Sequence, residues 1–376
     1  MQPGQIKNAL FSLLGWRTDR KIIVIESDDW GSIRMPSKEV YASLKKAGLD
    51  LDSGDSYRYN KYDTLANAED FSVLFDTLLR FKDSRGKSAV LTAVSVVANP
   101  DFETIRDLDF LEYHYESIEQ TIERYTGGKD AFAMWKTGIE QNVFIPQFHG
   151  REHLNVPVWM RALQENNQQA KLAFDQGVWG FNNMHAEGIS FQAAFNPSTV
   201  SEVEYHKEVI KDGTRLFQKL FDYDASFFVP PNGQLSNSLE TTLNDCGIKF
   251  TANAKMQFES IGLGRTKRSL HYLGQKSRRG QTYLIRNCFF EPSSEGKNWV
   301  ESCLKEIEFA FKWKQPAIIG SHRVNYVGGL DIKNRDSGIG QLSDLLSSVT
   351  KRWPEIEFMT SAELGEIILG NKELNQ

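Results

Sequence analysis

Cysteine is scarce in this chain, and its placement argues against two kinds of site. The sequence has 376 residues but only three cysteines, Cys246, Cys288 and Cys303, which are widely spaced and form no CxxC pair. An odd and scattered set of thiols indicates neither a disulfide framework nor a thiolate zinc site. We therefore expect a reducing compartment, and we assign the protein to the cytoplasm.

Long apolar runs, linkers and strong charge are also missing. No apolar run reaches the length of a membrane span, so we expect no transmembrane segment. No Pro/Ser-rich linker, low-complexity segment or internal repeat occurs, which favours one domain over two. The formal net charge is only -5, and the densest basic stretch, Gly264 to Gly280, is too short and isolated to predict nucleic-acid binding. We interpret that stretch as a pair of solvated loops.

Short apolar runs alternate with helical patterns along the whole chain. The first run, residues 21–30, is rich in β-branched residues and ends in acids, which is typical of a buried parallel strand. Further strands are predicted at 88–97, 142–148, 225–230, 249–254, 282–290, 315–322 and 356–360, and helices at 70–86, 108–125, 156–170 and 340–353. This alternation predicts a parallel sheet or barrel over residues 21–376. Residues 1–20 are expected to form a short amphipathic segment packed on that domain.

Polar residues follow three of the predicted strands. Asp28 and Asp29 end the first strand, His149 follows the strand at 142–148, and His322 ends the strand at 315–322. Active groups of a βα barrel lie at the C-terminal ends of its strands. This convergence predicts a site more strongly than any single motif does.

The stretch FIPQFHGREHLN carries His149 and His153, a pair that can converge on one cation if the backbone is helical or tightly turned. The same letters match H-x-x-E-H, the inverted zinc-peptidase motif, in which Glu152 would be functional. However, Pro146 and Gly150 make a long helix through this point unlikely. Two ordinary core histidines are the third interpretation.

The motif order resembles that of the polysaccharide deacetylases of carbohydrate esterase family four, the NodB-homology domain. That family has an Asp-Asp strand end, then H-[ST]-x-x-H, an R-x-P-[YF]-type turn, and a late L-x-H. This chain carries Asp28-Asp29, the pair His149 and His153, the turn FVPPNG and the tripeptide GSH in the same order. The resemblance implies a single distorted (β/α) barrel that removes acetyl groups from sugars with a metal ion.

The resemblance also implies roles for single residues. Asp29, His149 and His153 would hold one divalent metal ion, most often zinc, with cobalt, nickel or iron as alternatives. Asp28 would be the general base, and His322 would be the general acid that protonates the leaving sugar oxygen or nitrogen.

A second set of residues is expected around the substrate. Pro231 and Asn232 would lie at the oxyanion hole, since the Pro-Pro-Asn-Gly turn can present backbone N–H groups. Trp30, Arg323 and Asn325 are the candidates for substrate contacts. We expect the substrate to be a carbohydrate, namely a glycan intermediate of surface-polysaccharide metabolism.

Four positions depart from the family pattern. Gly150 replaces Ser or Thr, Val229 replaces Arg, Asn232 replaces Tyr or Phe, and Gly320 replaces the Leu that walls the acetyl pocket. No D-x-x-D-W motif supplies a charge partner for His322. We therefore expect an intact metal triad in a rebuilt and looser acyl pocket, unless a side chain such as Trp30 or Asn325 refills the gap. The alternatives are a metallopeptidase and a glycan-binding barrel.

Overall fold

A parallel β-sheet forms the centre of this computed structural model, which describes residues 14–54, 56–125, 130–181, 188–253, 255–261 and 265–370. The order of its strands is β10-β7-β6-β5-β2-β1-β12-β11, and β13 pairs with the start of β1. All its pairings are parallel. The strands are β1 (Ile22–Trp30), β2 (Leu91–Ser95), β5 (Phe144–Phe148), β6 (Phe227–Phe228), β7 (Phe250–Asn253), β10 (Thr282–Ile285), β11 (Cys288–Phe289), β12 (Ala317–His322) and β13 (Glu357–Phe358).

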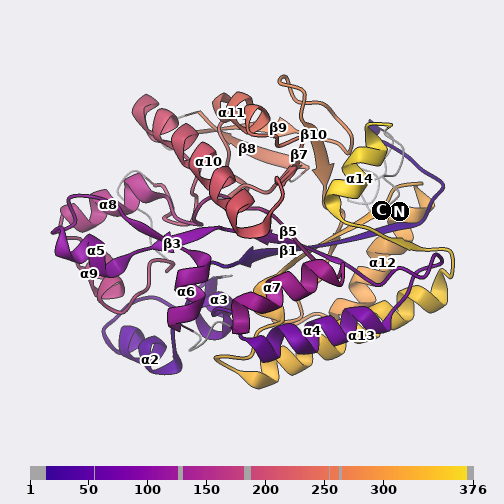
Figure 1. The fold of residues 1–376 in the computed structure, drawn as a ribbon, viewed down its shortest axis with the longest axis horizontal. Helices are drawn as coiled ribbons and strands as arrows, with labels where there is room; N and C mark the ends of the chain where they lie inside the picture. Colours follow the sequence, from indigo (N-terminus) through magenta and orange to yellow (C-terminus); the bar gives the residue numbers. More distant parts are fainter. Residues whose placement is uncertain are drawn as a thin grey trace.

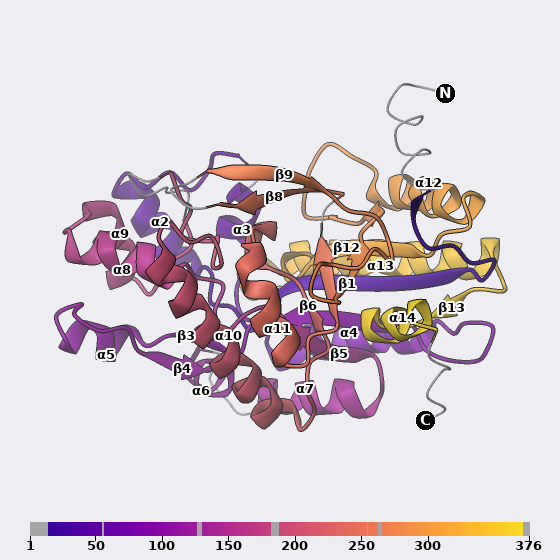
Figure 2. The same cartoon turned by 90° about the horizontal axis from the view of Figure 1, so that it is seen from above.

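Helices cover both sides of this sheet (Figures 1 and 2). The neighbours α4, α7 and α13 pack beside one another on one side, and α10 and α11 lie on the other. None of the described helices is long and apolar enough to cross a membrane. The helices are α2 (Lys38–Lys46), α3 (Ser56–Tyr62), α4 (Ala68–Arg80), α5 (Phe102–Asp107), α6 (Ile118–Tyr125), α7 (Asp130–Glu140), α8 (Val156–Gln164), α9 (Gln168–Asp175), α10 (Val200–Phe221), α11 (Glu240–Asp245), α12 (Trp299–Lys312), α13 (Ile332–Arg352) and α14 (Ser361–Ile368).

The two edge strands of the sheet are almost continuous in sequence. The run at 282–290, predicted as one strand, forms β10 at one edge and β11 at the other, so that prediction was wrong. Only Arg286 and Asn287 separate them, and an extended chain spans at most about 3.6 Å per residue. The sheet therefore curls until its edges approach each other, which confirms the predicted distorted (β/α) barrel.

Several predicted elements are shorter or are interrupted. The helix predicted at 108–125 exists only from Ile118, because β4 (Tyr115–Ser117) pairs with β3 (Ala98–Pro100) just before it. The helix predicted at 156–170 is split into α8 and α9 near Asn166, which has a positive φ of 59°. Two long helices, α10 and α12, were not predicted, and neither was the hairpin of β8 (Met256–Ser260) and β9 (Thr266–Leu270).

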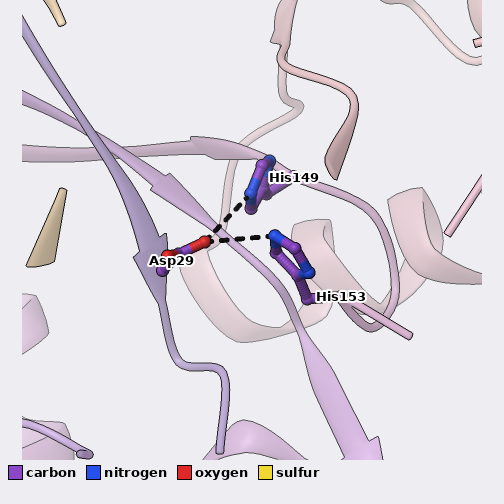
Figure 3. Close-up of side chains that lie close together, drawn as sticks. All are labelled: Asp29, His149 and His153. Atoms are coloured by element: carbon purple, nitrogen blue, oxygen red, sulfur yellow. Dashed lines mark ion pairs between the residues drawn. The ribbon is translucent and has the colours of Figure 1, made fainter. Parts of the chain in front are cut away.

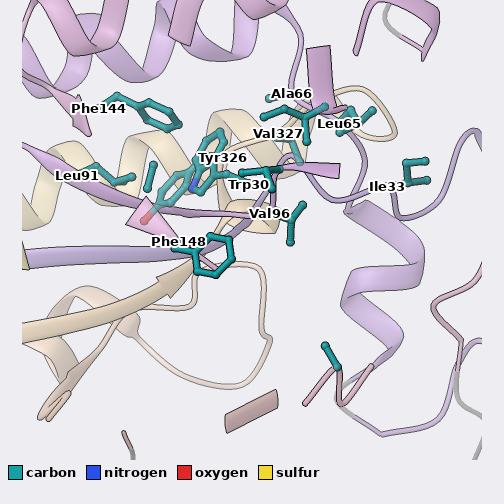
Figure 4. Close-up of a cluster of buried hydrophobic side chains, with 14 of the residues drawn as sticks. Trp30, Ile33, Leu65, Ala66, Leu91, Val96, Phe144, Phe148, Tyr326 and Val327 are labelled. Atoms are coloured by element: carbon teal, nitrogen blue, oxygen red, sulfur yellow. The ribbon is translucent and has the colours of Figure 1, made fainter. Parts of the chain in front are cut away.

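Trp30 lies in the main hydrophobic core, and this corrects its expected role at the substrate (Figure 4). Its side chain is 1% exposed, its ring packs edge-on against Phe144 at 4.8 Å between centroids, and its indole N–H donates to the Ser27 hydroxyl. An indole with its polar atom satisfied inside the core offers no face to a sugar.

The expected N-terminal segment lies mostly outside the described residues, which begin at 14. Within the described part, Leu14 is exposed. Trp16 packs against a second, smaller cluster of buried hydrophobic residues, which includes Leu273, and its backbone N–H donates to the Leu273 carbonyl oxygen at 2.7 Å.

Candidate active site

Three strand ends meet at one edge of the sheet and carry the polar residues singled out above. β1 and β12 are neighbours in a register that pairs Asp28 with His322. β5 lies two strands away from β1, beyond β2, and His149 follows its last residue directly. The expected clustering at the C-terminal ends of parallel strands is thus present.

A bulge in β1 sends its two adjacent acids in different directions. Between Ser27 and Trp30 the pairing with β2 shifts, because three steps along β1 match only two steps along β2. Asp29 adopts a left-handed backbone with a φ of 74°, which aspartate tolerates better than most residues do. As a result, Asp28 faces β12, whereas Asp29 faces the two histidines.

Asp29, His149 and His153 form a buried cluster whose ligand atoms all lie within 4.8 Å of one another (Figure 3). The Asp29 Oδ1 atom lies 3.5 Å from His149 Nε2 and 3.2 Å from His153 Nε2. His149 Nδ1 lies 2.7 Å from the Val229 carbonyl oxygen, which can only accept a hydrogen bond. In its neutral form His149 therefore carries its proton on Nδ1 and turns the Nε2 lone pair toward the carboxylate.

This cluster fits a cation. His149 Nε2 is buried without a hydrogen-bond partner among the described residues, and so is His153 Nδ1. Burial lowers the pKa of His153 to about 4, so this ring is neutral at pH 7. A lone pair that faces a carboxylate oxygen repels it unless a positive charge lies between them. Two imidazoles and one carboxylate are also the donor set of catalytic zinc sites.

Gly150 separates the two histidines for a conformational reason. Its φ is +104°, a region that side chains disfavour, and a Cβ atom here would lie 3.0 Å from the Phe195 ring. Glycine at this position therefore allows the tight turn that brings His153 back beside His149.

On the side away from the histidines, Asp29 contacts the buried Arg34, which in turn contacts the buried Asp63. Arg34 Nη2 lies 3.3 Å from the Asp29 Oδ2 atom, and Arg34 Nε lies 3.7 Å from Asp63. Burial by itself raises the pKa of Asp29, but the nearby charge of Arg34 is the largest opposing cause, and this pKa is held well below its usual value. Asp29 is therefore ionised, as a metal ligand must be.

Arg323 belongs to this support and not to the substrate surface, which corrects its expected role. Its guanidinium is fully buried, bonds both oxygens of Asp63 at 2.9 and 3.0 Å, and donates to the Ser32 carbonyl oxygen. With its donors used inside the protein, Arg323 acts by holding Asp63 in place.

Asp28 is paired with an arginine that the sequence analysis did not identify. Arg286 Nη2 and Nη1 lie 2.6 and 2.7 Å from the two oxygens of Asp28, and its Nε lies 2.5 Å from Glu26. Burial alone raises the pKa of Asp28, but the Arg286 charge more than offsets this and lowers it. Asp28 is therefore an ionised, firmly oriented carboxylate. Glu26 is fully buried, and burial raises its pKa.

Gly320 makes room for this arginine. A Cβ atom at Gly320 would lie 2.8 Å from Arg286 Cδ, so the arginine stem occupies the space that a side chain would take. The gap expected from the missing Leu is therefore filled by Arg286, and neither Trp30 nor Asn325 fills it.

His322 has a charge partner in Glu291, another residue that the sequence analysis missed. Its Nδ1 atom lies 2.6 Å from Glu291 Oε1, and its Nε2 atom points toward Asp28 at 3.9 Å. Burial lowers the pKa of His322, but the Glu291 carboxylate outweighs burial and raises this pKa to about 9. His322 is therefore protonated at pH 7, the state that a general acid needs.

Asn325 and Arg58 hold this pair together. The Asn325 amide is fully buried and donates to Glu291 Oε2 at 2.9 Å, and Arg58 lies 2.5 Å from the same oxygen. The expected substrate contact of Asn325 is thus corrected to a support for Glu291. Tyr59, beside Arg58, packs edge-on against the His322 ring at 5.5 Å between centroids.

We predict that Glu291→Gln shifts the pH dependence of turnover. Glu291 raises the pKa of His322, so removing its charge lowers that pKa. A general acid is lost as pH rises through its pKa, so the alkaline limb of kcat, expected near pH 9, should move to lower pH. Ser293→Ala is the control, because it removes a neutral neighbour of Asn325. An unchanged alkaline limb in Glu291→Gln would exclude this role for Glu291.

The turn after β6 connects the histidine cluster with a possible oxyanion site. Val229, whose carbonyl oxygen orients His149, is followed by Pro230 and by the buried Pro231. Asn232 is exposed and has a φ of 55°, and Gly233 N–H donates back to Pro230 at 2.8 Å. The hydrogen bond between Gly233 and Pro230 therefore closes the turn, and the contact of the Val229 carbonyl oxygen with His149 connects the turn to the proposed metal site.

Glu152 is directed away from the cluster. Both of its oxygens accept from Arg151, at 2.7 and 2.9 Å, and its exposed fraction is 2%. Glu152 is not part of the cluster that Asp29 forms with the two histidines, and its carboxylate is turned toward Arg151, so among the described residues it is not placed as the base of a peptidase.

The whole chain was compared with family models, with curated proteins and with solved structures. No family model matches it, and no curated protein matches its sequence. A putative polysaccharide deacetylase from Mycobacterium smegmatis is 8% identical over 96% of each chain, with a TM-score of 0.44. The peptidoglycan deacetylase PdaC from Bacillus subtilis is 10% identical over 93% of this chain and 92% of its own, with a TM-score of 0.37.

A further solved structure belongs to an enzyme with another activity. The 4-alpha-glucanotransferase from Thermococcus litoralis is 10% identical over 94% of this chain but only 40% of its own, with a TM-score of 0.45. The solved structures that are similar to this chain thus include deacetylases and a glucanotransferase.

Proposed function

We propose that this protein is a metal-dependent carbohydrate deacetylase that cleaves an N- or O-acetyl group. One observation carries the proposal. A buried Asp-His-His cluster, suited to a cation, lies beside an ionised carboxylate and a protonated histidine at the same sheet edge. Hydrolysis of an acetyl group uses these three components together.

The metal site would consist of Asp29, His149 and His153. A bound divalent ion, most often zinc, supplies Lewis acidity that polarises the acetyl carbonyl and lowers the pKa of water toward about 7. The supports described above serve this site, since Arg34 keeps Asp29 ionised and Val229 fixes the tautomer of His149.

Proton transfer would fall to Asp28 and His322. Asp28 accepts the proton of the attacking water on a carboxylate oxygen, and Arg286 keeps that carboxylate oriented. His322 donates the proton on Nε2 to the leaving sugar oxygen or nitrogen. These two groups are 3.9 Å apart at Oδ2 and Nε2, close enough to act on one scissile bond. The backbone N–H of Asn232 is the donor proposed for the carbonyl oxygen.

The acyl pocket is proposed to be small. The looser pocket expected from Gly320 is not supported, because Arg286 fills the space. We therefore propose acetyl as the acyl group, and an intermediate of surface-polysaccharide metabolism as the class of substrate.

The two alternative functions are less well supported. A peptidase would need a distant glutamate as the third ligand, whereas Asp29 completes the histidine pair. A binding module has no use for a histidine whose pKa is raised to about 9 beside a clamped carboxylate.

Metal removal tests this proposal. We expect the purified protein to release acetate from acetylated amino-sugar or xylose oligomers, to lose this activity with a chelator, and to regain it with Zn²⁺. His153→Ala should reduce bound metal, measured by elemental analysis, well below one ion per chain. Glu152→Gln is the matched control in the same motif and should retain the metal. Acetate release that resists chelation, or cleavage of peptides instead, would contradict the proposal.

A further inference from the structure

A two-stranded hairpin stands apart from the main sheet. It consists of β8 (Met256–Ser260) and β9 (Thr266–Leu270), which pair antiparallel with each other and with no other described strand. Its register places Met256 opposite Leu270, Gln257 opposite Ser269, and Phe258 opposite Arg268. Because residues opposite each other lie on the same face, the hairpin has two distinct faces.

The inner face is anchored to the domain. Gln257 is 3% exposed, and its side-chain oxygen lies 2.7 Å from His271 Nε2. The His271 ring in turn packs on Tyr283 of β10, with 4.1 Å between centroids. This anchoring leaves the opposite face free.

The outer face, defined as Met256, Phe258, Arg268 and Leu270, is exposed and carries three apolar side chains and one arginine. Its three apolar side chains are 40%, 45% and 50% exposed, in sequence order. Ile261 and Tyr272, just beyond the two strands, are also exposed. Five of the twelve exposed large hydrophobic residues of the described chain therefore fall within residues 256–272. Such a concentration marks a contact surface more often than chance exposure.

Positive charge is concentrated in β9 and in the segment that follows it, although Lys267 lies opposite Glu259 on the inner face of the hairpin. Residues 265–280 contain six Lys or Arg residues and no acid, although the chain as a whole has a net charge of -5. All six are exposed, and none forms an ion pair with a described residue; they are Arg265, Lys267, Arg268, Lys276, Arg278 and Arg279. Arg268 lies over the Phe258 ring, at 5.8 Å from its centroid.

We propose that the outer face docks the protein on an anionic lipid bilayer. An apolar ridge can enter the headgroup region while neighbouring cations pair with lipid phosphates, and neither part suffices alone. A soluble polyanion would use the cations but would gain nothing from exposed Met and Leu side chains. This inference is independent of the deacetylase proposal, because it uses no residue of the candidate active site.

Vesicle co-sedimentation of the full chain tests the proposal. The probes are vesicles of phosphatidylcholine alone and vesicles with phosphatidylglycerol added, both at low and high salt. One variant, Lys267→Glu/Arg268→Glu, changes the charge, and another, Phe258→Ser/Leu270→Ser, changes the apolar ridge. The matched control is Ile332→Ser/Lys333→Glu, which makes the same types of change at exposed positions of α13, on the other side of the molecule in Figure 1.

We expect binding to the anionic vesicles only, weakened by salt. The charge variant should lower the partition coefficient at least about 30-fold, since each cation near such a surface contributes about fivefold. The apolar variant should lower it about tenfold, and the control should change it less than twofold. Equal binding to both vesicle types, or none to either, would overturn the proposal. So would binding to a soluble polyanion that ignores the apolar variant, or a concentration-dependent dimer that both variants disrupt.

Discussion

Asp28→Asn is expected to bind metal as the natural protein does and to lose about 10²–10⁴-fold in kcat, the usual contribution of a general base. The amide keeps the shape of the side chain but cannot accept the proton of the attacking water. KM should change much less than kcat, because the proton transfer occurs in the transition state. Elemental analysis and steady-state kinetics on one preparation measure both quantities.

Glu26→Gln is the control for this variant. Glu26 also bonds Arg286, at 2.5 Å, but it is fully buried and cannot meet a substrate. Its raised pKa makes it the carboxylate that tolerates a neutral replacement best. Glu26→Gln should therefore retain most of the turnover. If both variants lose turnover equally, orientation of Arg286 explains the effect and Asp28 is not the base.

The parts of the site that could be predicted from sequence are those that follow strand ends. Asp28, His149 and His322 were found because apolar runs stop at them, and parallel strands bring such ends together. Glu291 obeys the same rule, since it follows the predicted strand at 282–290. It was not identified because only the D-x-x-D-W motif of the family was considered as the source of a charge partner for His322.

Arg286 and Trp30 show what local patterns cannot convey. Arg286 lies inside the run predicted as one strand, and its partner Asp28 is 258 positions away in the sequence. Trp30, which follows two acids, was named as a candidate for substrate contact because a tryptophan can stack on a sugar. The bulge at those acids adds one residue and reverses the alternation of side chains, so Trp30 turns into the core.

The fold class was predictable because the alternation of strands and helices is a local pattern. That pattern alone left a sheet and a barrel open, and the barrel was implied by the family resemblance, because the curling depends on the two residues that carry the chain from β10 to β11. The long helix α10 was missed because its mixed composition hides the apolar face that it packs on the sheet.

Gly320→Leu is expected to destabilise the protein by about 3–5 kcal/mol and to abolish most activity, although leucine is the residue of the resembled family at this position. The new Cβ atom would lie 2.8 Å from Arg286 Cδ. Arg286 cannot move aside cheaply, because Glu26 and Asp28 hold its guanidinium. Displacing it would leave buried carboxylates without their counter-charge, a loss of that size. Denaturant unfolding measures the change in the free energy of unfolding.

A double-mutant cycle separates this cause from simple overpacking. In the Arg286→Ala background the arginine stem is absent, so Gly320→Leu should cost less than about 1 kcal/mol more. Gly340→Leu, the same substitution at an exposed position of α13 with no atom within 4 Å, should be neutral or slightly stabilising. If Gly320→Leu costs the same in both backgrounds, its effect does not pass through Arg286. Non-additivity, in contrast, would mean that Gly320 and Arg286 act together. The absence of a side chain at Gly320 on β12 leaves space for Arg286, and Arg286 orients Asp28.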